Sequence, residues 1–197
     1  SIQLISRRVI AHARQHPEQS LGVGTFSLRQ QLAIQDEIER LRRENPELEM
    51  FFEPAPERGF FVKNLENIQG DDRDVIFLSV TYAKGAEGRL RHNFGPINGP
   101  NGWRRLNVLI TRARLALRVF SSMHGDEIDL TKVTSQGARN LREFLLFAES
   151  DIVTPTRVDA EASTDSAFED DVFRELSQQG LRLVPQVGVA GYRIDFG

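Results

Sequence analysis

The chain has 197 residues, of which 40% are hydrophobic and 27% are charged, and its formal net charge is −3. This size predicts one globular domain of about 150 residues with a further piece attached. The small negative charge excludes a uniformly basic, polyanion-binding protein, and the absence of cysteine excludes disulfides and cysteine-bound zinc. No apolar stretch reaches the ~18 residues of a membrane span, and no signal pattern opens the chain, so we expect a cytoplasmic protein with no membrane partner.

Hydrophobic periodicity and turn residues predict alternating helices and strands in the first third of the chain. Ser27 is expected to cap the helix that begins at Leu28, and Pro17 and Pro46 are expected to end helices. The expected elements are a helix over residues 2–16, a strand over 21–26, a helix over 28–44, and strands over 50–53 and 60–63.

The central stretch carries two polar motifs, and each leads into an apolar run. QGDDRD, residues 69–74, precedes VIFLSV, residues 75–80. WRRLNVLITRAR, residues 103–114, precedes LALRVF, residues 115–120. Each motif therefore places a polar loop or short helix against a buried strand, which is where α/β proteins usually build phosphate sites.

The second motif predicts a helix that opens near Gly102. Its expected buried stripe recurs at i, i+3, i+4 and i+7: Leu106, Leu109, Ile110 and Ala113. Arg105 and Arg112 are seven residues apart, so they are expected to project from nearly the same polar face, about two turns apart. Two guanidinium groups aimed in one direction need a polyanion or carboxylates opposite them. The abundance of arginine elsewhere in the chain is open to two interpretations, a composition bias or bidentate phosphate recognition.

The remainder predicts a last strand over residues 115–121 and a helix that ends near residue 150. Thr134 or Ser135 is expected to cap that helix. A polar linker, another helix and two strands are then expected over residues 151–164, 165–179, 181–189 and 192–196. These elements give a first domain over 1–150, a linker over 151–164 and the start of a second domain over 165–197.

The two motifs resemble signature motifs of superfamily 1 helicases. QG-x-(E/D)-x-D before a buried strand is similar to motif V, and RRLNV-x-(I/L)-TRAR before another strand is similar to motif VI. The spelling is closest to the branch that contains the nonsense-decay helicases, and to large bacterial helicase-related proteins with a C-terminal nuclease domain. The resemblance covers roughly residues 20–150 and implies the second RecA-like motor domain, an α/β fold with a parallel sheet flanked by helices.

In the family, the arginine of the TRA string stabilises charge on the transferring γ-phosphoryl group. The resemblance therefore implies that Arg112 is a catalytic arginine finger, a role that contributes on the order of 10³–10⁵ in rate. A surface salt bridge is the alternative for Arg112. For Arg105, placed by the resemblance in the ATP site, a phosphate contact and a surface salt bridge both remain open.

Motif V implies three further contacts with ATP, from Gln69, Gly70 and Asp72. Gly70 lacks a side chain, so its backbone N–H can approach a phosphate closely, although an ordinary turn glycine is the alternative. Asp72 stands where the family usually has a glutamate that accepts from the ribose hydroxyls, and it is one methylene shorter. Asp74 is expected to brace the loop.

Two candidates for nucleic-acid contact are Asn64, on the resemblance, and Ser79. The turn TFSLRQQ resembles motif IV, in which an arginine often reaches the terminal phosphate. Gln31 stands at that position here, which puts a motif IV finger in doubt. Gln30 and Gln31 are expected to be solvated helix residues.

The tail from residue 166 resembles the opening of very-short-patch-repair-type endonucleases of the PD-(D/E)XK class. The resemblance implies that Asp195 is a Mg²⁺-binding carboxylate and that Glu169 is an auxiliary acid. The class needs a following strand with Glu-x-Lys or similar, so this endonuclease-like unit is expected to be truncated.

Together these observations predict the C-terminal motor domain of an ATP-dependent superfamily 1 helicase acting on DNA, or on RNA. ATP and Mg²⁺ are expected only in the full-length protein, where a missing N-terminal RecA-like domain is the partner. No P-loop is present in the sequence, so we expect no ATP hydrolysis by the chain alone. The alternative is a catalytically inactive RecA-like module that binds nucleic acid or protein and is attached to a nuclease. A phosphate-binding metabolic enzyme is less well supported, because no candidate general base lies near the arginines in sequence.

Overall fold

The computed structural model describes residues 2–55, 58–68, 70–80, 82 and 92–150, together with the backbone of residues 185–189 and 192–196. The chain divides into two compact units, residues 1–142 and 143–197. The helices are α1 (Ile2–Gln15), α2 (Leu28–Glu44), α3 (Glu49–Phe52), α4 (Gly102–Ile110) and α5 (Gln136–Glu149). The strands are β1 (Leu21–Thr25), β2 (Phe61–Asn64), β3 (Arg73–Val80), β4 (Ala113–Ser121), β5 (Pro185–Val189) and β6 (Tyr192–Phe196).

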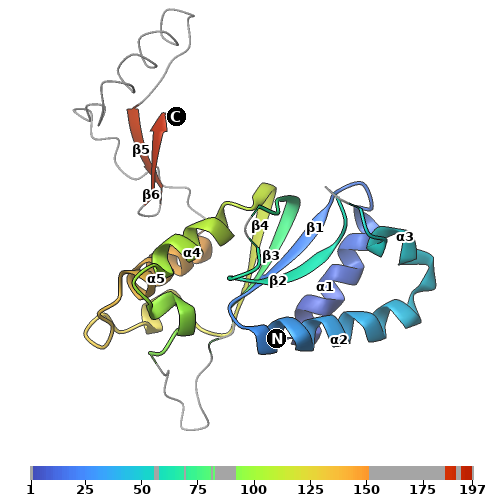
Figure 1. The fold of residues 1–197 in the computed structure, drawn as a ribbon, viewed down its shortest axis with the longest axis horizontal. Coiled ribbons are helices and arrows are strands. Elements are labelled where there is room, and N and C mark those ends of the chain that lie inside the picture. Colours follow the sequence, from blue (N-terminus) through green and yellow to red (C-terminus); the bar gives the residue numbers. More distant parts are fainter. Residues whose placement is uncertain are drawn as a thin grey trace, which may run out of the picture. The chain divides into compact units, whose positions relative to one another are not determined.

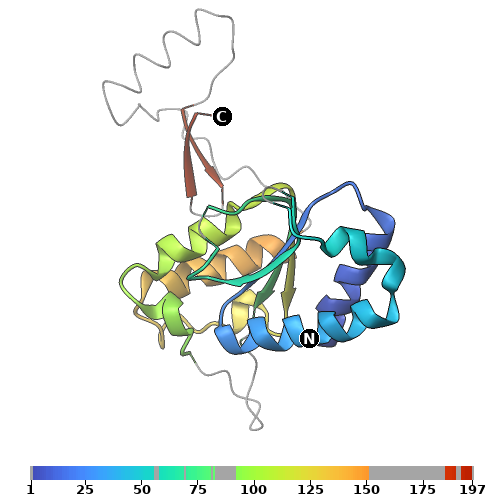
Figure 2. The same ribbon diagram turned by 45° about the vertical axis from the view of Figure 1, so that its right-hand side comes forward.

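The first unit is built on a four-stranded sheet in the order β2-β1-β3-β4, and every neighbouring pair of strands is parallel. Helices α1 and α2 cover one face of this sheet and α4 covers the other (Figures 1 and 2). Parallel strands covered on both faces are expected to be apolar along their whole length, and β1 is buried throughout. The predicted α/β fold, with a parallel sheet flanked by helices, is confirmed.

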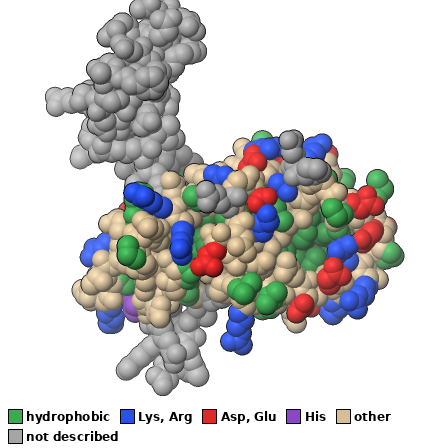
Figure 3. Space-filling model, in the orientation of Figure 1, with side chains coloured by type: hydrophobic (Ala, Val, Ile, Leu, Met, Phe, Trp, Pro, Cys, Tyr) green, Lys and Arg blue, Asp and Glu red, His purple; other side chains and the backbone are tan. Residues whose placement is uncertain are grey.

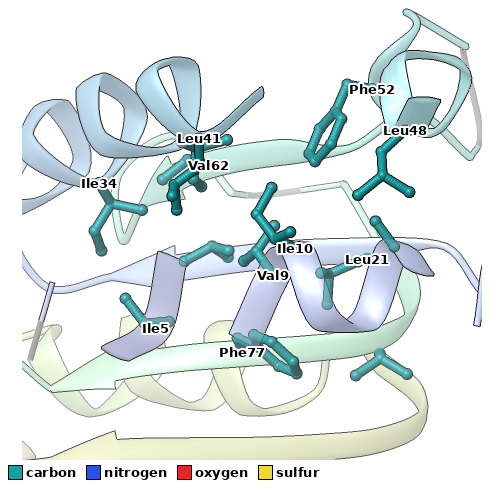
Figure 4. Close-up of a cluster of buried hydrophobic side chains, with 14 residues drawn as sticks. Ile5, Val9, Ile10, Leu21, Ile34, Leu41, Leu48, Phe52, Val62 and Phe77 are labelled. Carbon is teal, nitrogen blue, oxygen red and sulfur yellow. The ribbon is translucent and has the colours of Figure 1, made fainter. Parts of the chain in front are cut away.

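One hydrophobic core lies between the sheet and the two N-terminal helices. It contains side chains from α1 such as Ile5 and Val9, from α2 such as Ile34, and Phe77 from β3 (Figure 4). The cap of α2 is also as predicted, because the backbone N–H of Gln30 donates to the Ser27 hydroxyl at 3.3 Å.

The opposite face of the sheet receives α4, whose Leu106 and Leu109 are fully buried. A Cβ atom at Gly24 would lie 2.5 Å from Cδ1 of Leu109. The missing side chain at Gly24 therefore lets α4 lie close against β1. This helix begins at Gly102, as predicted, and its position sets the turn that leads into β4.

Two local predictions are wrong. Residues 50–53, expected as a strand, belong to α3 and the residue that follows it, because a run of four residues is too short for periodicity to separate a strand from a helix. The Phe52 ring packs edge-on against Phe60, with centroids 5.2 Å apart. Residues 115–120 form a strand as expected, within β4, but the expectation that this strand is buried is wrong, since Leu115 is 69% exposed. Within the described residues β4 pairs only with β3, so it is an edge strand.

In the second unit, β5 and β6 form an antiparallel pair, which confirms strands within 181–189 and 192–196. The expected linker and the helix over 165–179 lie outside the described residues, so the domain boundaries remain predictions.

Ser135 is the cap residue of α5, because its hydroxyl accepts from the backbone N–H of Ala138 at 3.2 Å. None of the described helices is both long enough and apolar enough to cross a membrane.

Candidate functional site

The two sequence motifs meet at the edge of the sheet where β3 and β4 begin. The backbone N–H of Arg73 donates to the carbonyl of Arg112 at 3.1 Å, and Arg73 faces Ala113 in the ladder between the two strands. Segments about forty residues apart in sequence are therefore adjacent in the fold. The site described below comprises the turn before β3 and the turn between α4 and β4.

Gly70 lies in an exposed turn and has a backbone φ of +87°, a left-handed conformation that side chains other than glycine rarely adopt. A Cβ atom at this position would meet nothing within 4 Å. The glycine is thus required by the backbone conformation, and open space adjoins it. Both predicted roles, a turn residue and a point of close approach to a ligand, fit this geometry.

Asp72 is half-exposed, and its carboxylate accepts a charge-assisted hydrogen bond from Nε of Arg114. This contact is the main reason why the pKa of Asp72 is below its usual value. The carboxylate expected to meet ribose hydroxyls therefore already has a cationic partner. Arg114 holds it in place.

Asp74 braces the start of β3, as predicted. Its Oδ2 atom accepts from both the backbone N–H and the hydroxyl of Ser20, each at 2.8 Å, and its own N–H donates to the Ser20 hydroxyl at 3.0 Å. The backbone N–H of Ser20 is the largest cause of the lowered pKa of Asp74. These three bonds tie the start of β3 to the residue just before β1.

Arg73 was missed by the sequence analysis. It is 5% exposed, donates from Nε to the Gly59 carbonyl at 2.8 Å and from Nη1 to the Asp72 carbonyl at 2.6 Å, and lies 4.8 Å from the centre of the Phe61 ring. Burial lowers its pKa. The only signal in the sequence was an arginine at the entrance to a buried strand. These contacts of the Arg73 side chain fix the backbone of the motif V loop.

The Arg112 side chain folds back onto the C-terminal end of α4. Its Nε donates to the Val108 carbonyl at 2.8 Å, and its Nη2 donates to the Thr111 hydroxyl at 3.2 Å. The last carbonyls of a helix lack intrahelical donors, so a guanidinium there is favourable. Arg112 is half-buried and forms no ion pair within the part of the chain that the structure describes. Among the described residues, its remaining N–H donors have no hydrogen-bond partner.

Arg105 and Arg112 do not share a helix face as predicted. The helix ends at Ile110, with Thr111 as its C-cap, because the chain must turn there to pair with β3. Arg105 is exposed on α4, and its Nη1 lies 3.7 Å from a carboxylate oxygen of Glu66, a surface ion pair. The structure thus shows the salt bridge that the sequence analysis left open for Arg105.

The two candidates for nucleic-acid contact are at the other edge of the sheet, near the ends of β2 and β3. Asn64 is 5% exposed, and its Oδ1 accepts from the backbone N–H of Glu66 at 2.9 Å. Ser79 is fully buried, and its hydroxyl accepts from Nε2 of Gln30 at 2.5 Å. The prediction that Gln30 is solvated is wrong, since this bond holds it inside. Gln31 is half-buried, and its Oε1 is buried without a hydrogen-bond partner.

The structure describes no side-chain position for three of the candidate residues. Gln69 and Glu169 lie outside the described residues, and for Asp195 the structure describes only its place in β6. In the described ranges, no group of three or more acidic or histidine side chains could hold a metal ion.

Comparison with known proteins assigns the chain to a family. Residues 2–124 match the model of a family described as an AAA domain. The chain is 32% identical over 172 residues to an uncharacterized ATP-dependent helicase of Mycoplasma genitalium, and 34% identical over 137 residues to its homolog in Mycoplasma pneumoniae. These matches take in 81% and 68% of this chain but only 15% and 12% of the two relatives. The family match spans the sheet and both motifs, and the chain belongs to the AAA domain family.

Proposed function

We propose that this chain is the second RecA-like motor domain of an ATP-dependent superfamily 1 helicase, from the branch that motifs V and VI resemble. It would complete an ATP site whose P-loop lies in another RecA-like domain of the same protein. The AAA domain match and the two relatives named as ATP-dependent helicases support this proposal. The chain spans only 15% and 12% of those two relatives, so each relative is long enough to contain a partner domain as well. This also supports the proposal.

The observation that carries the proposal is the set of contacts that the Arg112 guanidinium makes. Among the described residues its guanidinium is held by a carbonyl and a hydroxyl, and no carboxylate neutralises it. It also follows directly on a helix that is docked tightly against the sheet. A positioned guanidinium with free N–H donors can stabilise the charge that develops on a γ-phosphoryl group.

The neighbouring residues have proposed roles that fit their surroundings. The open space at Gly70 would let its backbone N–H approach a phosphate, and Gln69 keeps its proposed contact with ATP. Asp72 would share its carboxylate between Arg114 and the ribose. Arg105 would leave Glu66 and bind a phosphate instead. Breaking the ion pair would cost little free energy, because exposed ion pairs contribute little to stability.

Magnesium would accompany ATP. Because the described residues offer no cluster of acidic ligands, the ion would be held by the phosphates and by the P-loop domain rather than by this domain. Magnesium usually takes one or two carboxylates plus phosphate oxygens, so this division is chemically reasonable.

The proposed polymer is DNA, with RNA as the other possibility. Asn64 and Ser79 are buried and bonded to protein. We therefore propose that they act on nucleic acid by shaping the turn after β2 and the start of α2, which would make the contacts. For the tail, the proposal is an endonuclease-like unit in which Asp195 and Glu169 bind Mg²⁺ in the full-length protein, and loss of cleavage in Asp195→Asn would be its test.

The motor proposal is tested by ATP turnover in the full-length protein. Arg112→Ala should lower nucleic-acid-stimulated turnover by about 10³-fold or more and leave strand binding within about twofold. Arg104→Ala is a matched control, because Arg104 is exposed on α4, the helix that precedes Arg112, and its guanidinium lies over its neighbour Trp103. Near-normal turnover in Arg112→Ala would favour the alternative, a catalytically inactive binding module.

A further inference from the structure

The three aspartates of the QGDDRD loop are held by partners in three different parts of the first unit. Nζ of Lys63, on β2, donates to Oδ2 of Asp71 at 2.5 Å. The other two aspartates are held by Arg114 on β4 and by Ser20 just before β1. Because β2 and β4 are at the two ends of the order β2-β1-β3-β4, the loop is tied to both edge strands of the described sheet.

The ion pair of Lys63 with Asp71 is partly buried. The two side chains are 33% and 27% exposed, compared with 45% and 61% for Arg105 and Glu66. Nζ of Lys63 also lies 5.4 Å from the centre of the Phe61 ring. Partly buried charges are screened less by water and salt than exposed ones, so this pair holds the loop more firmly than the surface pair does.

The residue held by Lys63 directly follows the left-handed glycine of the loop. Gly70 is exposed, with φ of +87°, and glycine has the widest choice of backbone conformations. The turn therefore keeps one conformation only if its neighbours are fixed. The backbone N–H of Asp71 donates to the Ile68 carbonyl at 3.2 Å, and the Lys63 contact fixes the side chain of the same residue. Asp71 is thus anchored at two points, directly beside Gly70.

Charges of both signs surround this loop. On the face shown in Figure 3, acidic and basic side chains lie next to one another over the end of the sheet where β3 and β4 begin. A phosphate that approaches this end is therefore attracted by some side chains and repelled by others. Its binding depends on how well the backbone donors are pre-organised, since pre-organisation lowers the cost of ordering the loop on binding.

We propose that Lys63 is a positioning residue of the ATP site. Through Asp71 it fixes the turn at Gly70, so that the Gly70 backbone N–H is held in place for a nucleotide phosphate. The inference rests on the proposed motor function and deepens it, because it gives a role at the nucleotide to a β2 lysine that lies outside both motifs. A contact of this kind is made in the ground state and in the transition state alike, so Lys63 acts on ATP affinity, whereas Arg112 acts on rate.

The test is calorimetric binding of AMP-PNP with Mg²⁺ to the full-length protein, together with kcat and KM for ATP. Lys63→Met and Asp71→Asn should each weaken AMP-PNP binding about tenfold and raise KM by a similar factor, with kcat unchanged within about twofold. Lys63→Arg keeps a cation that can reach Asp71 and should bind within about threefold of the unsubstituted protein.

The two single variants also separate positioning from a simple effect of charge. Lys63→Met removes a positive charge and Asp71→Asn removes a negative one, so electrostatics alone would weaken binding of an anionic nucleotide in the first and strengthen it in the second. Positioning predicts weaker binding in both. The double variant should bind about as weakly as either single variant, because both substitutions break the same contact.

Lys132→Met is the matched control. It removes the ion pair of Lys132 with Asp129, whose side chains are 64% and 36% exposed and which lies outside both motifs. AMP-PNP binding should stay within about twofold of the unsubstituted protein. Circular dichroism checks that each variant folds.

The outcomes separate this inference from the motor proposal. Tighter AMP-PNP binding in Asp71→Asn, unchanged binding in both single variants, or additive losses in the double variant would overturn the positioning role. If Arg112→Ala loses turnover while the Lys63 and Asp71 variants bind normally, the motor proposal stands without this inference. A full-length protein that binds no AMP-PNP would overturn both.

Discussion

Replacing Asp74 with alanine should strongly destabilise the first unit. The carboxylate accepts from the N–H and the hydroxyl of Ser20, each at 2.8 Å, and Ser20 is only 4% exposed. The substitution leaves two buried donors without their acceptor, at a cost of about 1–3 kcal/mol each. The Ser20 hydroxyl still accepts from the backbone N–H of residue 74, so we expect a total loss of about 2–4 kcal/mol.

The measurement is urea-induced unfolding followed by the fluorescence of Trp103, the single tryptophan, which lies on α4. Asp74→Asn keeps a carbonyl acceptor and should lose about half as much. Asp126→Ala is the control, because Asp126 is exposed in a short 3-10 helix, and it should change stability by less than about 0.5 kcal/mol. A similarly small change in Asp74→Ala would refute the bracing role.

Three further predictions concern stability. Because Ser20 holds the pKa of Asp74 below its usual value, ionised Asp74 stabilises the folded state above its unfolded pKa of about 4, and this contribution is lost as pH falls through the lower folded pKa. Unfolding measured from pH 6 to pH 2 should show a shallower acid decline in Asp74→Asn, and an unchanged slope would contradict the assignment. Ser27→Ala removes the cap of α2 and should cost about 1 kcal/mol in the same unfolding assay, with Ser122→Ala as an exposed control. Gln30→Leu and Ser79→Ala should show a coupling energy of about 1 kcal/mol in a double-mutant cycle, whereas additive effects would mean that their bond contributes nothing.

Local signals were sufficient to predict several elements. The bounds of α2 followed from Ser27 and the periodic apolar residues, and the start of α4 followed from Gly102 and its buried leucines. The meeting of motifs V and VI could be anticipated because both lead into strands of one parallel sheet.

The failures at Gln30, Arg112 and Arg73 have a common cause, which is tertiary pairing. The burial of Gln30 depends on Ser79, 49 residues away, so its exposure could not be inferred from its own helix. The helix before Arg112 stops early because the Arg112 carbonyl accepts from Arg73 in the sheet. The role of Arg73 depends on Gly59 and Phe61, contacts that no local pattern encodes.

The most direct test of the central claim is single-turnover ATP hydrolysis by the full-length protein carrying Arg112→Ala. If Arg112 acts on the γ-phosphoryl group mainly in the transition state, the hydrolysis rate constant should fall by about 10³ or more while ATP affinity changes less than about tenfold. A rate constant within threefold of the unsubstituted protein would contradict the account.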